Sequence, residues 1–157
     1  MLPPVLTVSF TLTVSHGGSN QRAGLFLLRP ELRWMQLVLD LSTSGFINVD
    51  KMAAADVIVL STPVYFYQMN AQMKTLIDRT MACYYDERLS GKAFYFIVTA
   101  AEDKPALERT MDGLRGLTDC IPDAKVCGCI YGANAWQLGD IQGNPAMDEA
   151  YQMGKAI

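Results

Sequence analysis

The sequence has few of the residues that bind metals. It contains one histidine, His16, and four cysteines, Cys83, Cys120, Cys127 and Cys129, with no C-x-x-C pair among them. Zinc and iron–sulfur sites draw their ligands from clusters of these residue types. Cys127 and Cys129 alternate along an expected strand, so they would need ligands from elsewhere to hold a metal. We therefore expect no metal site and mostly buried, reduced thiols.

Long apolar runs and basic runs are also missing. No apolar stretch approaches the roughly 20 residues of a membrane-spanning helix. The opening residues 1–15 lack the basic start and the cleavage site of a signal peptide. The 13 basic and 16 acidic residues are scattered and give a net charge of −3, with no stripe that follows a phosphate backbone. We expect no membrane or nucleic-acid partner and, with reduced thiols, a cytoplasmic location.

The chain has the length and apolar content of one α/β domain. Its 157 residues, 50% of them apolar, are enough for a single core, and we expect one domain over residues 1–157. From Ala53 onward, strand-length apolar runs alternate with helical stripes, which is typical of a parallel sheet covered by helices on both faces. The expected elements are a strand at 56–60, a loop at 61–68, a helix at 70–83, a strand at 93–98, a helix at 105–120, a strand at 125–131 and a helix at 145–156.

The first 50 residues follow this pattern less clearly. Residues 5–15 are expected to form a first strand or an edge strand, and 16–24 a loop rich in glycine and polar residues. The stretch 25–41 is mixed and interrupted by Pro30, and no second strand is evident in it. About 30 residues separate Gly24 from the strand at Asp56, which is short for a helix, a strand and another helix. The sequence therefore indicates a shortened or altered N-terminal part.

Three consecutive aromatic residues follow the first clear strand. Tyr65, Phe66 and Tyr67 lie where polar turn residues are typical. Ligands of an open parallel sheet bind outside the carboxyl ends of its strands. A flavin ring needs a planar apolar wall together with backbone N–H and C=O groups. The pattern fits a flavin site, and the alternative is an aromatic cluster that packs against the next helix or a partner subunit.

The residues around these aromatics resemble a known family. Residues 55–80, ADVIVLSTPVYFYQMNAQMKTLIDRT, are similar to the flavin loop and following helix of the NADPH-dependent FMN reductases and related flavodoxin-fold oxidoreductases. Residues 91–101, 130–140 and 150–154 resemble later segments of the same family, so the match runs from about Lys51 to Ile157. The resemblance implies a flavodoxin-like three-layer α/β sandwich with a mostly parallel sheet, in which one N-terminal strand is lacking or altered.

The resemblance also implies a function. The family's members are oxidoreductases that pass reducing equivalents from NAD(P)H through bound FMN to a small acceptor, as homodimers. Because the cofactor carries the chemistry, no catalytic side chain is expected. The implied cofactor-binding residues are Thr62, Pro63, Val64, Tyr65, Phe66, Tyr67, Thr99, Ala100 and Ala101. The alternatives are a flavin-binding electron carrier without its own small-molecule substrate, and a defective relative with weak or no FMN binding.

The chain departs from the family pattern at the expected phosphate loop. The family has a Gly-Ser-Pro-Arg-like loop after its first strand, whose backbone N–H groups bind the FMN phosphate. Here the corresponding residues His16–Gly24 read HGGSNQRAG, and an ordinary solvated turn is the alternative. Trp136, in a later glycine-rich loop, covers either the pocket or a partner subunit. The sequence does not decide between NADH and NADPH.

Overall fold

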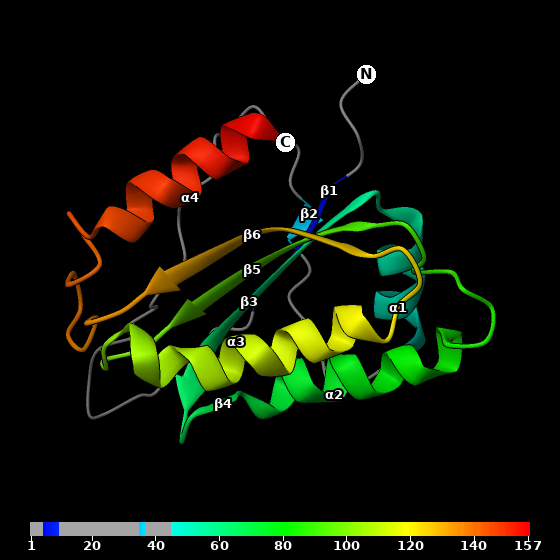
Figure 1. Ribbon diagram of the computed structural model, residues 1–157, viewed down its shortest axis with the longest axis horizontal. Coiled ribbons are helices and arrows are strands. Elements are labelled where there is room, and N and C mark those ends of the chain that lie inside the picture. Colours follow the sequence, from blue (N-terminus) through cyan, green and yellow to red (C-terminus); the bar gives the residue numbers. More distant parts are fainter. Residues whose placement is uncertain (1–4, 10–34, 37–44) are drawn as a thin grey trace.

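A parallel sheet forms the centre of the computed structural model, which describes residues 5–9, 35–36 and 45–157 (Figure 1). The strand order is β2-β1-β3-β5-β6, and neighbouring strands on this path run parallel. This is the order of a doubly wound sheet of the flavodoxin type. The strands are β1 (Val5–Ser9), β2 (Met35–Gln36), β3 (Val57–Tyr65), β5 (Ala93–Thr99) and β6 (Lys125–Gly132). A short strand β4 (Gln68–Met69) pairs antiparallel with the end of β3.

Helices cover both faces of this sheet. Helices α2 and α3 lie on one face and α4 lies on the other, while α1 lies beside the end of α2 (Figure 1). The helices are α1 (Gly45–Ala54), α2 (Ala71–Arg79) with the 3₁₀ turn η1 (Thr80–Cys83), α3 (Lys104–Asp119) and α4 (Pro145–Ala156). The predicted three-layer α/β fold is therefore confirmed. None of the helices in the described ranges is long and apolar enough to cross a bilayer.

The main core lies between the sheet and helices α2 and α3. Strand β5 alternates, so that Phe94, Phe96 and Val98 are fully buried while the residues between them are half-buried. Side chains spaced three and four residues apart on the helices fill the space above them, as expected for one apolar face of a helix. They are Met73, Leu76, Leu107, Met111 and Leu114. Each such burial stabilises the fold by about 1.5–3 kcal/mol.

The N-terminal part has more of the fold than the sequence indicated. Strand β2 occupies residues 35–36, so the expectation that no second strand lies in 25–41 is wrong. Two residues are too few to give a periodic pattern. Strand β1 lies between β2 and β3, which confirms it as the first strand and excludes the edge position. Helix α1, not predicted, buries Val49 and Met52. The predicted phosphate loop at 16–24 lies outside the described residues.

Strand β3 is longer than predicted. The expected loop at 61–68 is instead the continuation of β3 through Tyr65, a two-residue turn and the strand β4. Ser61 and Thr62 remain buried and paired with β5, so the sheet extends past the apolar run that marked the strand in the sequence. The predicted strand stopped at Leu60 because Ser61 and Thr62 are polar. Threonine is nevertheless common in strands, because its branched side chain fits a pleated, buried surface.

Two substitutions in α3 should have opposite effects on stability. Met111→Ala removes a fully buried side chain and should lower the free energy of unfolding by about 2–5 kcal/mol. Gly116→Ala places a methyl group where no atom lies within 4 Å and should raise it by about 0.5–1 kcal/mol. Urea denaturation of both variants beside the unchanged protein measures the difference. Equal stability of Met111→Ala and the unchanged protein would contradict this core.

Candidate functional site at the carboxyl edge of the sheet

The segments that follow β3, β5 and β6, at the edge where a parallel sheet binds ligands, begin side by side. In the sheet register Pro63 pairs with Thr99, and Thr99 pairs with Gly132. Strand β1 ends near this edge, where Ser9 pairs with Ser61, two residues before Pro63. The segments that leave β3, β5 and β6 therefore start from one edge. The order of the strands reverses beside β1, between β1 and β3. Ligands of a doubly wound sheet bind at this point, outside the carboxyl ends of the strands.

The segment after β3 is a tight hairpin with aromatic residues at its tip. Tyr65 pairs with Gln68, and the two residues between them have positive φ angles, 50° for Phe66 and 61° for Tyr67. Glycine and asparagine usually occupy such turns, because a bulky side chain in the left-handed region costs about 1–3 kcal/mol. The side chains of Tyr65, Phe66 and Tyr67 are 41%, 98% and 50% exposed. Strain and apolar exposure therefore coincide at this tip.

A buried hydrogen-bond pair fixes the base of the hairpin. The backbone N–H of Asn70 donates to the Thr62 hydroxyl over 3.1 Å, and that hydroxyl donates to the Pro63 carbonyl over 2.9 Å. The Asn70 side chain then accepts from the N–H of Met73 over 2.9 Å and caps α2. Thr62 and Asn70 are 1% and 4% exposed. The hairpin and the start of α2 are thus held as one unit.

Helix α3 supports the side of the hairpin. The Arg109 guanidinium lies over the Tyr67 ring, with its central carbon 5.0 Å from the ring centroid. One helical turn further, a β-carbon at Gly113 would lie 3.1 Å from the terminal methyl of Met69, so glycine allows β4 to approach the helix closely. The aromatic hairpin therefore rests on the same helix that fills the core.

The segments after β5 and β6 are joined by backbone hydrogen bonds. Ala100 donates to Gly132 over 3.0 Å and accepts from Ala135 over 2.9 Å, and Asn134 donates to Glu102 over 2.9 Å. Both backbone groups of Ala100 are therefore used within the protein. By contrast, the backbone groups of Ala101 form no hydrogen bond to any other described residue, and neither do those of Phe66 and Tyr67. Among the described residues these groups have no partner, so they are available there to the polar edge of a ligand.

Trp136 is held in an ordered loop after β6. The Asp140 carboxylate accepts from the backbone N–H groups of Trp136 and Gln137, over 2.9 Å and 2.6 Å. The Asn144 side chain donates to the Ala133 carbonyl over 2.9 Å and closes the loop at its other end. The Trp136 side chain is 76% exposed. Both roles predicted for Trp136 need an exposed ring, and both stay predictions.

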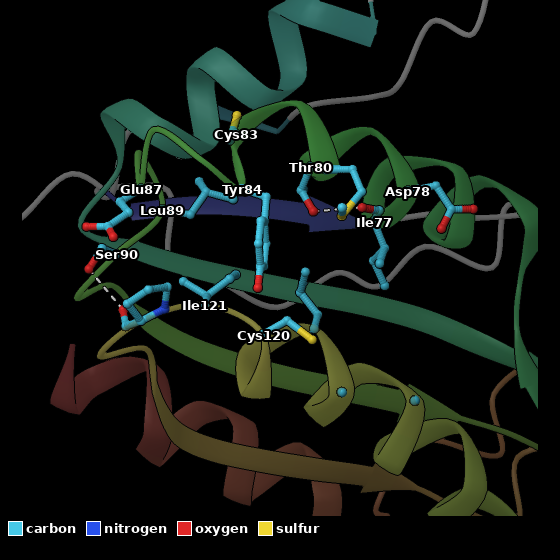
Figure 2. Close-up of a pocket in the computed structure, with 15 residues that line it drawn as sticks. Ile77, Asp78, Thr80, Cys83, Tyr84, Glu87, Leu89, Ser90, Cys120 and Ile121 are labelled. Atoms are coloured by element: carbon cyan, nitrogen blue, oxygen red, sulfur yellow. Dashed lines mark hydrogen bonds between the residues drawn. The ribbon is translucent and has the colours of Figure 1, made fainter.

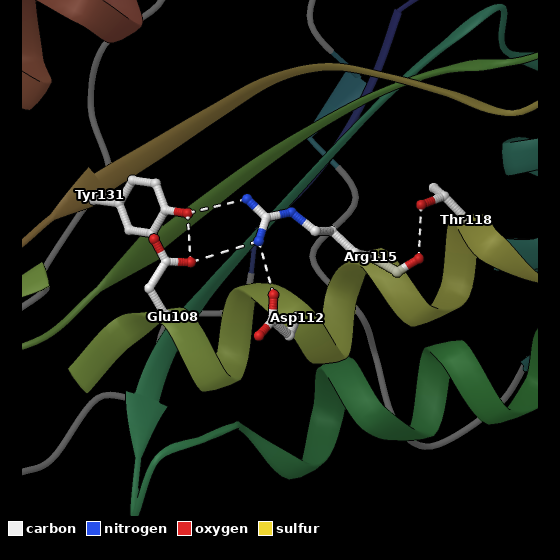
Figure 3. A network of polar contacts seen from close by, with 5 residues as sticks. All are labelled: Glu108, Asp112, Arg115, Thr118 and Tyr131. Carbon is white, nitrogen blue, oxygen red and sulfur yellow. Dashed lines mark hydrogen bonds and ion pairs between the residues drawn. The ribbon is translucent and has the colours of Figure 1, made fainter. Parts of the chain in front are cut away.

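A polar network fastens the carboxyl end of β6 to α3 (Figure 3). The Tyr131 hydroxyl donates to Glu108 over 3.0 Å and accepts from Arg115 over 3.2 Å, while Arg115 also donates to Asp112 over 2.8 Å. Burial, and then the hydrogen bond to Glu108, raises the pKa of Tyr131 above its usual value. The hydroxyl therefore keeps its proton at neutral pH, and the network holds the edge of the site in place.

The cysteines and the acidic residues give no metal centre in the described part of the chain. No group of three or more histidine, cysteine or acidic side chains lies close enough to hold an ion there. All four cysteines are free, and only Cys83 is fully buried. The expectation of mostly buried thiols is wrong, because Cys120 and Cys127 are exposed at the end of α3 and on the edge strand β6.

The structure brings the predicted cofactor residues to one edge but gives them unequal exposure. Thr62 is buried beneath the hairpin, where its hydroxyl is fully used, so its part is structural support. Pro63, Val64, Thr99, Ala100 and Ala101 are half-buried. Sequence reasoning missed Asn70 and Arg109. Asn70 could have been found as an N-cap directly before a helical stripe, whereas the contact of Arg109 with Tyr67 has no local signal.

The ring portion of FMN fits this edge. An exposed aromatic wall and backbone groups that have no partner among the described residues lie at the same edge, which matches a flat ring with one polar side. The residues that would bind its phosphate, 16–24, are not among those described. Fold and edge together define a flavodoxin-like α/β protein with an exposed aromatic hairpin at the switch point of its sheet.

The family model for NADPH-dependent FMN reductases matches residues 48–126, just over half of the chain, and the chain belongs to this family. Its members use FMN as cofactor and NAD(P)H as electron donor, so the predicted oxidoreductase class and cofactors are confirmed. No curated protein sequence matches the chain.

Solved structures share the fold at low sequence identity. The apo form of the NADH:FMN oxidoreductase EMOB has a TM-score of 0.66 at 16% identity, covering 99% of this chain and 88% of its own. The flavoenzyme NAD(P)H:(acceptor) oxidoreductase FerB from Paracoccus denitrificans has a TM-score of 0.62 at 13% identity, covering 98% and 92%. The Trp repressor binding protein from Bacillus subtilis has a TM-score of 0.61 at 15% identity, covering 70% of each chain.

Removing the Thr62 hydroxyl should loosen the hairpin. Thr62→Val keeps the shape of the side chain but leaves the buried N–H of Asn70 without a partner, and should lower the free energy of unfolding by about 1–3 kcal/mol. Thr62→Ser keeps the hydroxyl and serves as the control, with a smaller loss expected. Chemical denaturation of both variants checks the ranking, which a more stable valine variant would reverse.

Proposed function

We propose that the aromatic hairpin and the adjoining β5 loop hold the isoalloxazine ring of FMN, and that the protein reduces a small acceptor at the expense of NAD(P)H. The observation that carries this proposal is the strained, exposed tip formed by Phe66 and Tyr67 at the switch point of the sheet. Backbone strain at a cofactor wall is a recurrent feature of binding sites. The family match supports the same reaction class.

The chemistry that FMN supplies when bound is acceptance of a hydride from NAD(P)H and transfer of electrons to an acceptor. The protein's part is to bind and orient. Tyr65 and Tyr67 offer ring faces, the N–H of Ala101 offers a donor, and Pro63 fixes the backbone at the start of the hairpin. Aromatic walls also exclude water from one side of the ring. No side-chain acid or base is needed in this scheme.

Loss of one aromatic ring from the hairpin should weaken FMN binding. Tyr67→Ala removes a half-exposed ring from the proposed wall, and a stacked ring contributes about 0.5–1.5 kcal/mol beyond the area it buries. We therefore expect the Kd for FMN to rise by up to about tenfold. The measurement is titration of the colourless protein with FMN, followed by the change in flavin fluorescence.

The matched control for this titration is Tyr151→Ala, which removes an exposed ring from α4 on the opposite face of the sheet. Its Kd for FMN should equal that of the unchanged protein. Equal losses in both variants would contradict the assignment of the hairpin. Retained FMN without oxidation of NADPH or NADH would leave the site in place and favour the electron-carrier alternative.

We also propose that the protein is cytoplasmic and forms a homodimer. Four free cysteines are consistent with a reducing compartment. A groove between η1 and the end of α3, with a cavity volume of about 220 Å³, offers a surface for a second copy. Figure 2 shows the ring of Tyr84 extending across this groove toward Cys120 and Ile121. Met81 and Tyr84 are 60% and 48% exposed there. Neighbouring exposed apolar side chains of this kind are typical of a surface that binds another protein.

A charge placed in this groove should separate the copies. Met81→Lys puts an ammonium group where the second copy would bury apolar surface, and the desolvation cost should shift the protein toward the monomer. Sedimentation velocity measures the mass, expected at twice 17.3 kDa before the substitution. Val126→Lys, at an exposed apolar residue on β6, is the control and should leave the dimer intact. A monomeric unchanged protein would contradict the proposal.

A further inference from the structure

Arg109 differs from the arginines that form ion pairs in the structure. Arg88 binds the carboxylates of Asp50 and Asp86, and Arg115 binds those of Asp112 and Glu108. Arg109 has no carboxylate partner and no hydrogen bond among the described residues. Asp112, the acidic residue one turn away on α3, is engaged by Arg115 and does not neutralise it. Within the described part of the chain, the Arg109 guanidinium therefore lies beside the aromatic hairpin without an ion pair.

The contact with Tyr67 holds this charge in a defined position. The guanidinium carbon lies 5.0 Å from the centroid of the Tyr67 ring. A guanidinium over a ring face uses its π surface for that contact and keeps its in-plane N–H donors for another partner. Such a planar fork matches two oxygens of a phosphate, and stacking reduces the side-chain entropy that is lost when the phosphate binds.

The position of Arg109 beside the proposed flavin wall indicates that the phosphate it meets belongs to the dinucleotide donor. Hydride transfer requires the nicotinamide ring of the donor to lie against the flavin, so the phosphates of the dinucleotide lie near the wall that holds the flavin. The chain carries a net charge of −3, which disfavours approach of a polyanionic donor. A cation at the rim of the proposed site, with no ion pair among the described residues, offsets this repulsion.

We propose that Arg109, stacked on Tyr67, binds a phosphate group of the pyridine-dinucleotide donor and thereby sets the affinity of the protein for NAD(P)H. This inference rests on the proposed function, because it requires the hairpin to be the flavin wall. Arg109 is a binding residue in this scheme and takes no part in the transfer of hydride. The shared chemistry is a phosphate, which is either the pyrophosphate of both donors or the 2′-phosphate of NADPH.

The test compares Arg109→Gln with the unchanged protein, both loaded with FMN. A charge-assisted hydrogen bond is worth about one to two powers of ten in affinity, so KM for the donor should rise about 10- to 100-fold with little change in kcat. Calorimetric titration with NADP⁺ and NAD⁺, which do not reduce the flavin, gives the same comparison without turnover. A higher Kd for both NADP⁺ and NAD⁺ identifies the pyrophosphate as the group that Arg109 binds. A higher Kd for NADP⁺ and a higher KM for NADPH alone identify the 2′-phosphate.

Two further variants separate this role from a general loss of charge or of structure. Arg79→Gln removes the same charge at the far end of α2 and should leave KM unchanged. Arg109→Lys keeps the charge without the planar fork and should recover part of the affinity. Added salt should raise KM for the unchanged protein more than for Arg109→Gln, because screening acts on the charge that the variant lacks.

The outcome that overturns the inference is an unchanged KM and unchanged nucleotide affinity in Arg109→Gln that binds FMN normally. A rise in the Kd for FMN without a change for the nucleotides would also overturn it, since the charge would then serve the flavin phosphate. Failure of the proposed function is distinct from both, because it shows as absence of FMN binding in the unchanged protein.

Discussion

The packing of helix α3 against the sheet is the interaction on which the rest of the site depends. Leu107, Met111 and Leu114 seal the core above β5, and this burial fixes the helix in place. The same helix meets the aromatic hairpin through Arg109 and Gly113. A core helix thus transmits its rigidity to a surface turn, which on its own would be a mobile two-residue loop.

That support explains how two bulky residues persist in the left-handed region. Phe66 and Tyr67 carry an unfavourable backbone conformation and exposed rings, and neither feature stabilises the folded chain by itself. The buried bond from Asn70 to Thr62 and the contact of Arg109 with Tyr67 offset part of the cost. A sequence that only needed a hairpin would place asparagine and glycine here. Phe66 and Tyr67 therefore carry a cost that the need for a hairpin alone does not explain, and this cost supports the proposed flavin wall.

The sequence pattern predicted those elements that are buried along a whole strand or along one face of a helix. The apolar runs at 57–60 and 93–98 and the helical stripe of α3 were readable, because burial of a whole strand or one helix face leaves a period in the sequence. Strand β2, with two residues, leaves none. The turn at Phe66 lacks the glycine and asparagine that mark a hairpin, so residues 61–68 were predicted as a loop and the hairpin was missed. The stacking of Arg109 on Tyr67 joins distant segments and has no signature in either.

The proposed wall for the flavin and the proposed phosphate contact meet at one pair of side chains. In this scheme the Tyr67 ring would have two neighbours, the flavin and the guanidinium of Arg109, and the position of the ring would set both contacts. In a protein with a net charge of −3, a local positive charge favours binding of a polyanionic donor that the overall field repels. Because α3 already holds the hairpin and Arg109 in place, neither contact has to be ordered when a ligand binds.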